Sequence, residues 1–228
     1  MKKILLSICV AALSCAANFQ AQANTILINA GSGGDVGTVT GGNLGYDFTV
    51  GSTPLMITAL GLWDGPQGGG AGFIGDGFGS EHIIGLWDNS GNLLAKATML
   101  IGTTDTLMGE FRYSSVLTPT NPGPVILSAN TTYVLGAAFA PRDPDVLKRN
   151  LPPFDPAVSS GNLRSSTGSF GFPTDNEGAG AYVGPNAIFS LVTNGNGVPE
   201  GGNALLMLAV AIGLLFIGRY AIARTVAG

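Results

Sequence analysis

Short segments in which every second residue is apolar run through the middle of this 228-residue chain. The segments Leu44–Val50 and Leu55–Trp63 show this alternation on either side of a Gly-Ser-Thr-Pro break. A period of two is typical of half-buried β-strands, so both segments are predicted to be strands. The other segments predicted as strands are His82–Trp87, Asn92–Leu100, Glu110–Leu117, Thr131–Phe139, Ala181–Val183 and Ala187–Val192.

These strands predict an all-β fold, and no segment of the body has the pattern of a long amphipathic helix. About eight to ten antiparallel strands between residues 24 and 197 favour a single-domain β-sandwich or jelly roll over a barrel. The turn-forming residues Asp88–Gly91 predict a hairpin between two of the strands. Two long connections, 65–80 and the proline-rich 140–175, are predicted to be surface loops.

The N-terminus has the pattern of a secretory signal peptide. Lys2 and Lys3 precede the apolar stretch Ile4–Leu13, and Ala21 and Ala23 form a small-x-small cleavage site. We therefore expect residues 1–23 to be removed on export. A retained membrane anchor is the less favoured alternative, because roughly ten apolar residues are too few to cross a bilayer core of about 30 Å.

Both cysteines of the chain, Cys9 and Cys15, lie in this N-terminal segment. Lipidation at Cys15 is an alternative to simple cleavage, although Ala12 fits poorly at the start of a lipidation motif. After cleavage before Asn24, the exported body would have no thiol and no disulfide, so its apolar core must stabilise it.

The C-terminus combines three features in order. Val198-Pro199-Glu200-Gly201-Gly202-Asn203 precedes the apolar run Ala204–Gly218, and Arg219 and Arg224 follow. The pattern predicts a transmembrane helix at about 204–223 with its basic end in the cytoplasm. A buried core helix is less favoured, because the run has no polar face.

This order of motif, apolar helix and arginines in Val198–Gly228 resembles the PEP-CTERM sorting signal of exported bacterial proteins. The resemblance implies recognition and removal of the tail by an exosortase-type membrane protease. Gly201 stands where the commonest form of the motif has a second proline, and Val-Pro-Glu-Gly-Gly is similar to a variant form.

The body also resembles a domain of unknown function that is common in PEP-CTERM proteins. The stretches that carry this resemblance are Leu44–Val50, Ile57–Asp64, Ser80–Thr98, Phe111–Tyr113 and Thr131–Leu135. The resemblance implies a β-sandwich outside the cell and brings no catalytic role or ligand with it.

The charge of the body limits its partners. Between Asn24 and Asn203 there are six basic and fourteen acidic residues, a formal net charge of −8. Such an acidic surface argues against nucleic acid or anionic lipid head groups as partners.

No catalytic constellation is recognisable, so the chain is predicted not to be an enzyme. The only histidine, His82, has no second imidazole to share acid–base work, and hydrogen bonding to a loop is its favoured role. There is no Gly-x-Ser-x-Gly motif. Gly70–Gly75 matches a dinucleotide fingerprint, but it lies in a glycine-rich loop with no βαβ context.

No cofactor is predicted. Asp64, Asp76, Glu81 and Asp88 lie in one glycine-rich region, and a calcium site built from them is the alternative to solvated loop carboxylates. Nothing in their spacing selects two of them as a glycosidase pair.

The tetrad Gly-Leu-Trp-Asp occurs twice, at Gly61–Asp64 and Gly85–Asp88. Core packing is the favoured role of Trp63 and Trp87. The alternative is a pair of aromatic platforms for an extracellular polysaccharide, with Asp64 and Asp88 as hydrogen-bond acceptors.

These patterns predict an exported, membrane-sorted surface or matrix protein with a structural or adhesive β-sandwich. A carbohydrate-binding module is the alternative function, and a hydrolase with dispersed carboxylates is the least favoured.

Overall fold

The computed structural model describes residues 24–29, 35–38, 41–66, 73–118, 123–150, 153–179 and 181–192. The expected signal peptide, with Ala21 and Ala23, and the expected sorting tail at 198–228 lie outside these ranges. Among the described residues, no helix is long and apolar enough to cross a bilayer.

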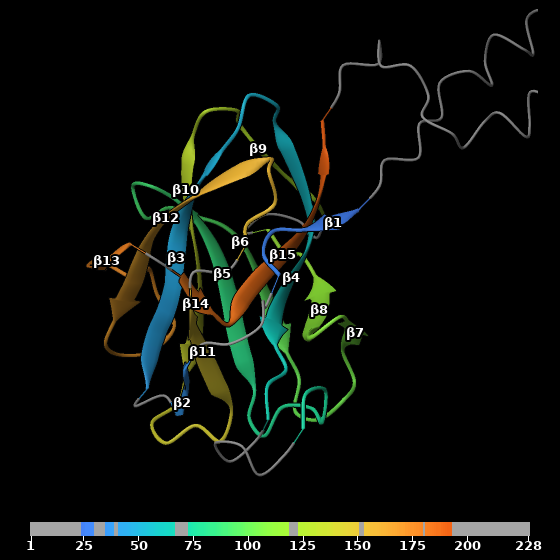
Figure 1. Ribbon diagram of the computed structural model, residues 1–228, viewed down its shortest axis with the longest axis vertical. Helices are drawn as coiled ribbons and strands as arrows, with labels where there is room; N and C mark the ends of the chain where they lie inside the picture. The colour runs from blue at the N-terminus through green and yellow to red at the C-terminus, as the bar shows by residue number, and fades with distance from the viewer. Residues whose placement is uncertain are drawn as a thin grey trace, which may run out of the picture. The chain divides into compact units, whose positions relative to one another are not determined.

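The described part of the chain is built from antiparallel strands, which confirms the all-β, sandwich-like fold (Figure 1). One six-stranded sheet, here the first sheet, has β9 (Val125–Leu127) beside β4. In sheet order its other strands are β1 (Thr25–Ile26), β15 (Pro185–Leu191), β4 (Leu55–Trp63), β8 (Phe111–Ser115) and β7 (Thr106–Met108).

The second sheet also has six strands, and a third, smaller sheet has three. The order of the second sheet is β13 (Asp175–Ala179), β12 (Val158–Ser166), β3 (Gly42–Val50), β10 (Thr132–Phe139), β5 (His82–Asp88) and β6 (Leu93–Met99). The third sheet consists of β14 (Ala181–Val183), β11 (Val146–Asn150) and β2 (Asp35–Thr38). The expected hairpin is confirmed, because β5 pairs antiparallel with β6.

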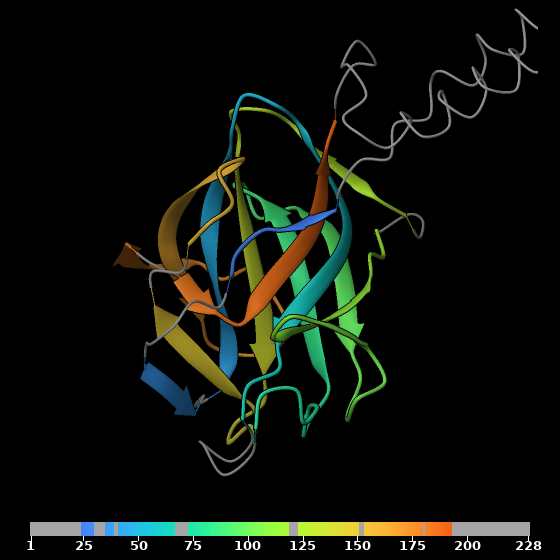
Figure 2. The same cartoon turned by 45° about the vertical axis from the view of Figure 1, so that its right-hand side comes forward.

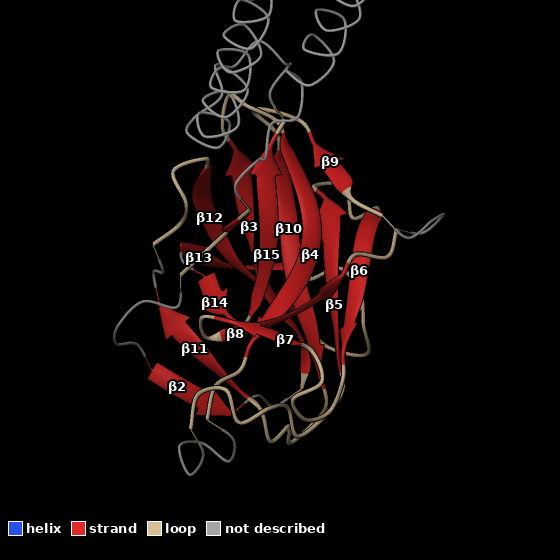
Figure 3. Ribbon diagram, turned by 90° about the vertical axis from the view of Figure 1, so that its right-hand side faces the viewer, coloured by secondary structure: helices blue, strands red, loops and turns tan. Residues whose placement is uncertain are grey.

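The first and second sheets face each other (Figures 2 and 3), and the apolar core lies between them. Alternate residues of β3 and β10, among them Phe48 and Leu135, belong to the core together with Leu60 and Phe189 of the first sheet. Tyr46 of β3 also donates a hydrogen bond from its hydroxyl to the carbonyl oxygen of Pro185, which joins the two sheets.

A β-bulge in β4 explains a break in its alternation. The register against β15 shifts between the pairs Ala59–Ile188 and Ile57–Phe189, so Thr58 is an extra residue. In a regular strand, even-numbered and odd-numbered residues face opposite sides of the sheet. The extra residue lets the even-numbered Leu60 and Leu62 face the core like the odd-numbered Leu55 and Ile57.

The prediction of one long loop at 140–175 is wrong. This region contains β11 and β12, and β13 starts at its end. The residues of β12 are mostly small or polar, so this strand has no pattern of alternating apolar residues. Its pairing with β3 and the hydrogen bonds from Asn162 and Arg164 to the Asp47 carboxylate position it instead.

We predict that Asn186→Ala lowers the free energy of unfolding by about 1–3 kcal/mol, because it leaves buried backbone groups unpaired. The buried Asn186 side chain accepts a hydrogen bond from the Ile28 amide (3.1 Å) and donates one to the Ile28 carbonyl (2.8 Å). Urea unfolding measures the change. Asn176→Ala, in the exposed β13, is the matched control and should change stability by less than about 0.5 kcal/mol. Equal effects of the two substitutions would contradict this account.

Candidate functional site

A buried cluster of ligand-type side chains lies where β10 ends and β5 begins. Because Ala138 pairs with Ile83, the residues that follow β10 lie beside His82. This connection carries Asp143 and Asp145, and both carboxylates approach the imidazole. Among the described residues, His82, Asp143 and Asp145 form the one group of three in which the atoms that could bind a metal ion all lie within 4.8 Å of one another.

The imidazole of His82 contacts an oxygen atom on each side. Its Nε2 atom lies 2.8 Å from Oδ2 of Asp145 and 3.8 Å from Oδ1 of Asp143. Its Nδ1 atom lies 3.2 Å from the carbonyl oxygen of Ala138. The rings of Phe78 and Phe139 pack against the imidazole, with centroids 5.4 and 4.9 Å away. This arrangement confirms the prediction that His82 hydrogen-bonds to a loop.

Backbone amides hold both carboxylates in place. Oδ1 of Asp145 accepts a hydrogen bond from the Gly79 amide (2.9 Å), and Oδ2 accepts one from the Ser80 amide (3.1 Å). Burial by itself raises the pKa of the Asp145 carboxyl, but the hydrogen bonds from His82, Gly79 and Ser80 outweigh it and lower the pKa. Asp145 is therefore an ionised acceptor at neutral pH.

Sequence reasoning missed Asp143 and Asp145, although a signal for them exists. The tripeptide Asp143-Pro144-Asp145 follows a predicted strand after only three residues. Had the pairing of that strand with the strand starting at His82 been known, the two carboxylates would have been placed beside the imidazole. Strand pairing between distant segments is not visible in alternation, so the signal could not be used.

Asp64, a predicted ligand contact, is fully buried in an ion pair. Its carboxylate accepts hydrogen bonds from Nε of Arg112 and from the Gly77 amide (3.0 Å). Arg112 also donates to the carbonyl oxygens of Asp105 and Gly75, both at 2.9 Å. Burial raises the pKa of the Asp64 carboxyl, while Arg112 and Gly77 oppose that rise. Asp64 thus ties loops to the first sheet.

Trp63 and Trp87 are each only 3% exposed, which supports the packing role over the aromatic platform. Trp63 belongs to the apolar core and donates a hydrogen bond from Nε1 to Oε2 of Glu110 (3.1 Å). A Cβ atom at Gly65 would lie only 2.4 Å from the Trp63 ring, so this position requires glycine.

Trp87 is buried on a different side of its sheet from the core cluster. Its ring packs against Phe170 and Phe172, which belong to the segment that joins β12 and β13. Asn43 holds this segment by donating to the Ser169 carbonyl (2.8 Å) and accepting from the Gly171 amide (3.0 Å). In this structure neither indole therefore presents a face for stacking with a sugar ring, and the proposed pair of platforms is not formed.

Asp88 has a local role. Its carboxylate accepts hydrogen bonds from the amides of Ser90 and Asn92, both at 2.9 Å, and from Nδ2 of Asn92 at 2.8 Å. The Asn92 side chain first, and then the backbone amides, lower the pKa of this exposed carboxyl. Asp88 closes the β5–β6 turn.

The four carboxylates considered for calcium do not gather into one set in the described structure. Asp64 pairs with Arg112, whereas Asp88 closes its own turn in the second sheet. Oδ2 of Asp76 accepts a hydrogen bond from the Phe73 amide (3.2 Å), and Glu81 is exposed.

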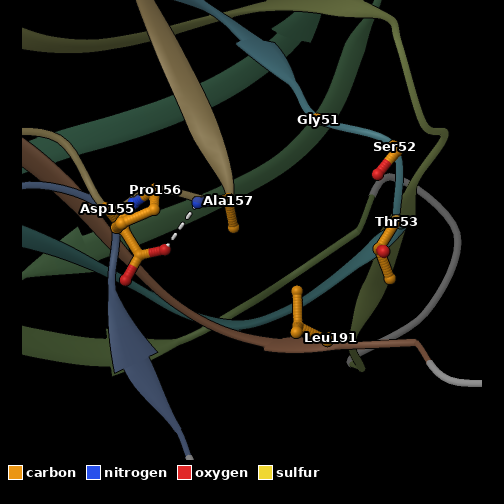
Figure 4. Close-up of a pocket in the computed structure, with 7 residues that line it drawn as sticks. All are labelled: Gly51, Ser52, Thr53, Asp155, Pro156, Ala157 and Leu191. Carbon is orange, nitrogen blue, oxygen red and sulfur yellow. Dashed lines mark hydrogen bonds between the residues drawn. The ribbon is translucent and has the colours of Figure 1, made fainter.

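A surface pocket lies near the ends of β3, β4 and β15 (Figure 4). One oxygen of Asp155 accepts a hydrogen bond from the Ala157 amide (2.8 Å), and the other accepts one from the Thr25 hydroxyl (3.3 Å). The only carboxylate of the pocket is thus engaged in holding loops. The residues that line the pocket are Gly51, Ser52, Thr53, Asp155, Pro156, Ala157 and Leu191. They include neither histidine nor a second carboxylate, so they form no acid–base pair.

Comparisons with known proteins assign no family. No protein-family model matches the chain, and no curated protein matches it either. Among solved structures, the infectious bursal disease virus VP2 subviral particle is 15% identical over 86% of this chain, with a TM-score of 0.20. This chain covers 47% of the viral chain. A similarity this low supports no conclusion about fold or function.

We predict that Arg112→Met lowers the free energy of unfolding by about 3–5 kcal/mol, because it leaves the buried Asp64 carboxylate without its cation. Chemical denaturation at neutral pH measures the loss, and adding Asp64→Asn should restore part of it. Arg164→Met is the control. Its side chain is 17% exposed in its pair with Asp47, so its substitution should cost clearly less. A loss at Arg112 no larger than at Arg164 would refute the role of the buried pair.

We also predict that Asn92→Ala raises the pKa of Asp88 toward its ordinary value, because the largest stabilising hydrogen bond to the ionised carboxylate is removed. In the intact protein, the stabilisation from this turn is present above the unfolded-state pKa and is lost as the pH falls through the lower folded-state pKa. Carbon-detected NMR titration of the Asp88 carboxyl measures the change. Asn89→Ala, which keeps the Asn92 side chain, should leave the pKa in place. An unchanged pKa in Asn92→Ala would count against the assignment.

Proposed function

We propose that this chain is an exported bacterial protein whose C-terminal tail delivers it to the cell surface or extracellular matrix. A signal peptide at 1–23 directs export, and a transmembrane helix at about 204–223 retains the chain at the membrane. An exosortase-type membrane protease then recognises the motif at 198–203 and removes the tail. The observation that carries this proposal is the order of Val-Pro-Glu, apolar run and arginines in one short segment.

The exported body acts in this proposal as a structural or adhesive β-sandwich without catalytic activity. The state of the buried polar side chains supports this role. Asp64, Asp145 and Asn186 each use their polar atoms to hold loops or strands of the body itself. Such contacts stabilise a cysteine-free fold outside the cell, where many other domains rely on disulfides.

An extracellular polysaccharide fits this proposal as a partner only if it binds away from Trp63 and Trp87. Both rings are buried, so a sugar would have to contact other residues of the surface. The acidic body disfavours nucleic acid.

The intact mass of the extracellular form tests the proposal. Expression of the full chain in a host with an exosortase should give a protein that starts near Asn24 and ends near Glu200. Replacing Pro199 and Glu200 together by alanine should leave the chain in the membrane with its C-terminus at Gly228. Asn194→Ala, just before the motif, is the control and should be processed normally. An extracellular wild-type protein that still ends at Gly228 would overturn the sorting proposal.

A further inference from the structure

The imidazole of His82 lies between two groups that only accept hydrogen bonds. The Ala138 carbonyl oxygen is 3.2 Å from Nδ1, and the ionised Asp145 carboxylate is 2.8 Å from Nε2. A neutral imidazole carries one N–H group and so satisfies only one of these acceptors. The other contact would place two lone pairs against each other at a fully buried site. A metal ion at Nε2 would satisfy both contacts, because the single N–H of the ring could then donate from Nδ1 to the Ala138 carbonyl.

The position of the second carboxylate favours a metal ion as the natural occupant. Asp143 Oδ1 lies 3.8 Å from Nε2, which is too long for a hydrogen bond, while Asp145 Oδ2 lies at 2.8 Å. In a tetrahedral zinc site with bonds of about 2.0–2.1 Å, the ligand atoms are roughly 3.3 Å apart. The two observed separations lie on either side of that value. A shift of about half an ångström for each carboxylate would bring both separations from Nε2 to that value.

The surroundings of the three side chains resemble the outer contacts of metal ligands. A histidine that binds a metal through one nitrogen usually donates from the other to a carbonyl or carboxylate, as Nδ1 can do toward Ala138. The second oxygen of Asp143 accepts from the Ala140 amide (2.9 Å), and Oδ1 of Asp145 accepts from the Gly79 amide (2.9 Å). These bonds fix the carboxylates. Oδ1 of Asp143 and Oδ2 of Asp145, which are the oxygens nearest Nε2, also accept hydrogen bonds from the amides of Asp145 and Ser80, both at 3.1 Å.

A fourth oxygen atom lies next to the same cluster. The hydroxyl oxygen of Ser80 is 2.7 Å from Oδ1 of Asp143 and 3.4 Å from Oδ2 of Asp145. The cluster is only one residue away from solvent, because Gly79, Arg142 and Pro144 are exposed. Gly79 lies in the loop before β5, and Arg142 and Pro144 lie in the connection after β10. An ion can therefore enter through a local opening of this loop and this connection, without disruption of the sheets.

We propose that His82 Nε2, Asp143 Oδ1 and Asp145 Oδ2 bind one divalent transition-metal ion of the zinc class. One imidazole nitrogen with two carboxylates suits Zn²⁺, whereas Ca²⁺ prefers six to eight oxygen ligands. The ion replaces the proton on Nε2 and joins the connection after β10 to the start of β5. This site goes beyond the proposed delivery to the cell surface. It gives a body without disulfides a metal cross-link between two loops.

The single histidine of the chain makes a direct test available. The full chain is expressed with ¹⁵N-labelled histidine and purified without a histidine tag, so every imidazole signal comes from His82. The exported form is treated with a chelator and titrated with Zn²⁺ alone. We expect the Nε2 resonance to shift and lose its proton at one equivalent of Zn²⁺, while the proton on Nδ1 stays. An Nε2 proton that persists in excess Zn²⁺ would overturn the proposal.

A pair of matched variants tests the carboxylate ligand. Asp143 and Asp155 each accept a hydrogen bond from the backbone amide two residues later, so each closes a local turn. Asp143→Asn keeps this bond and removes the ligand charge, and Asp155→Asn makes the same change away from the cluster. We expect Zn²⁺ to raise the Tm of the wild type and of Asp155→Asn in a saturable way. In Asp143→Asn the Zn²⁺-dependent rise should disappear or need at least tenfold more Zn²⁺.

The NMR titration and the variant comparison test the metal site independently of the sorting proposal. A wild-type protein that binds no Zn²⁺ at His82 overturns the metal site whether or not the tail is cleaved. Equal Zn²⁺ affinity in Asp143→Asn and the wild type would also overturn it. If Asp143→Asn fails to fold, the NMR titration of the wild type decides the question.

Discussion

Burial of apolar side chains between the first and second sheets holds this protein together, because no cysteine follows Cys15 in the chain. The core residues come from nearly all the long strands, and the Tyr46 hydroxyl bonds across the core to the backbone of β15. A sheet contributes to such a core only if its apolar side chains keep to one face. In β4 the apolar residues change from odd-numbered to even-numbered positions, and the bulge at Thr58 keeps them on one face. The packing of the sheets then sets where each loop begins.

The ends of the strands are fixed by buried polar networks. Asp64 and Arg112 hold loops beside the first sheet, and His82 with Asp143 and Asp145 holds loops beside the second. Each network places a charged group in the interior, where loss of one partner costs more than the pair itself contributes. These networks therefore specify loop positions more than they add stability. The His82 cluster differs from the Asp64 pair, because both ring nitrogens of its imidazole face oxygen acceptors, whereas Asp64 faces the cationic side chain of Arg112.

Much of the fold follows from alternation, and the failures have a common cause. Strands with one apolar face, such as β3, β4 and β10, were predicted almost to the residue. The strand β12 was missed, because its polar sequence is positioned by pairing with β3 and by bonds to Asp47. Short edge strands such as β7 were missed for a similar reason, since all of its residues are exposed and leave no periodic pattern. Alternation reports burial on one face and does not report pairing.

The two Gly-Leu-Trp-Asp tetrads separate what the sequence determined from what the tertiary structure decided. The sequence alone determined that both are strand ends and that the body is an antiparallel all-β fold without disulfides. The tertiary structure decided that Asp64 is buried against Arg112 while Asp88 stays at the surface in its own turn. It likewise placed Asp143 and Asp145 beside His82. Local sequence sets which conformation a segment prefers, but the partner of a buried charge comes from distant residues, and only the packed sheets bring them together.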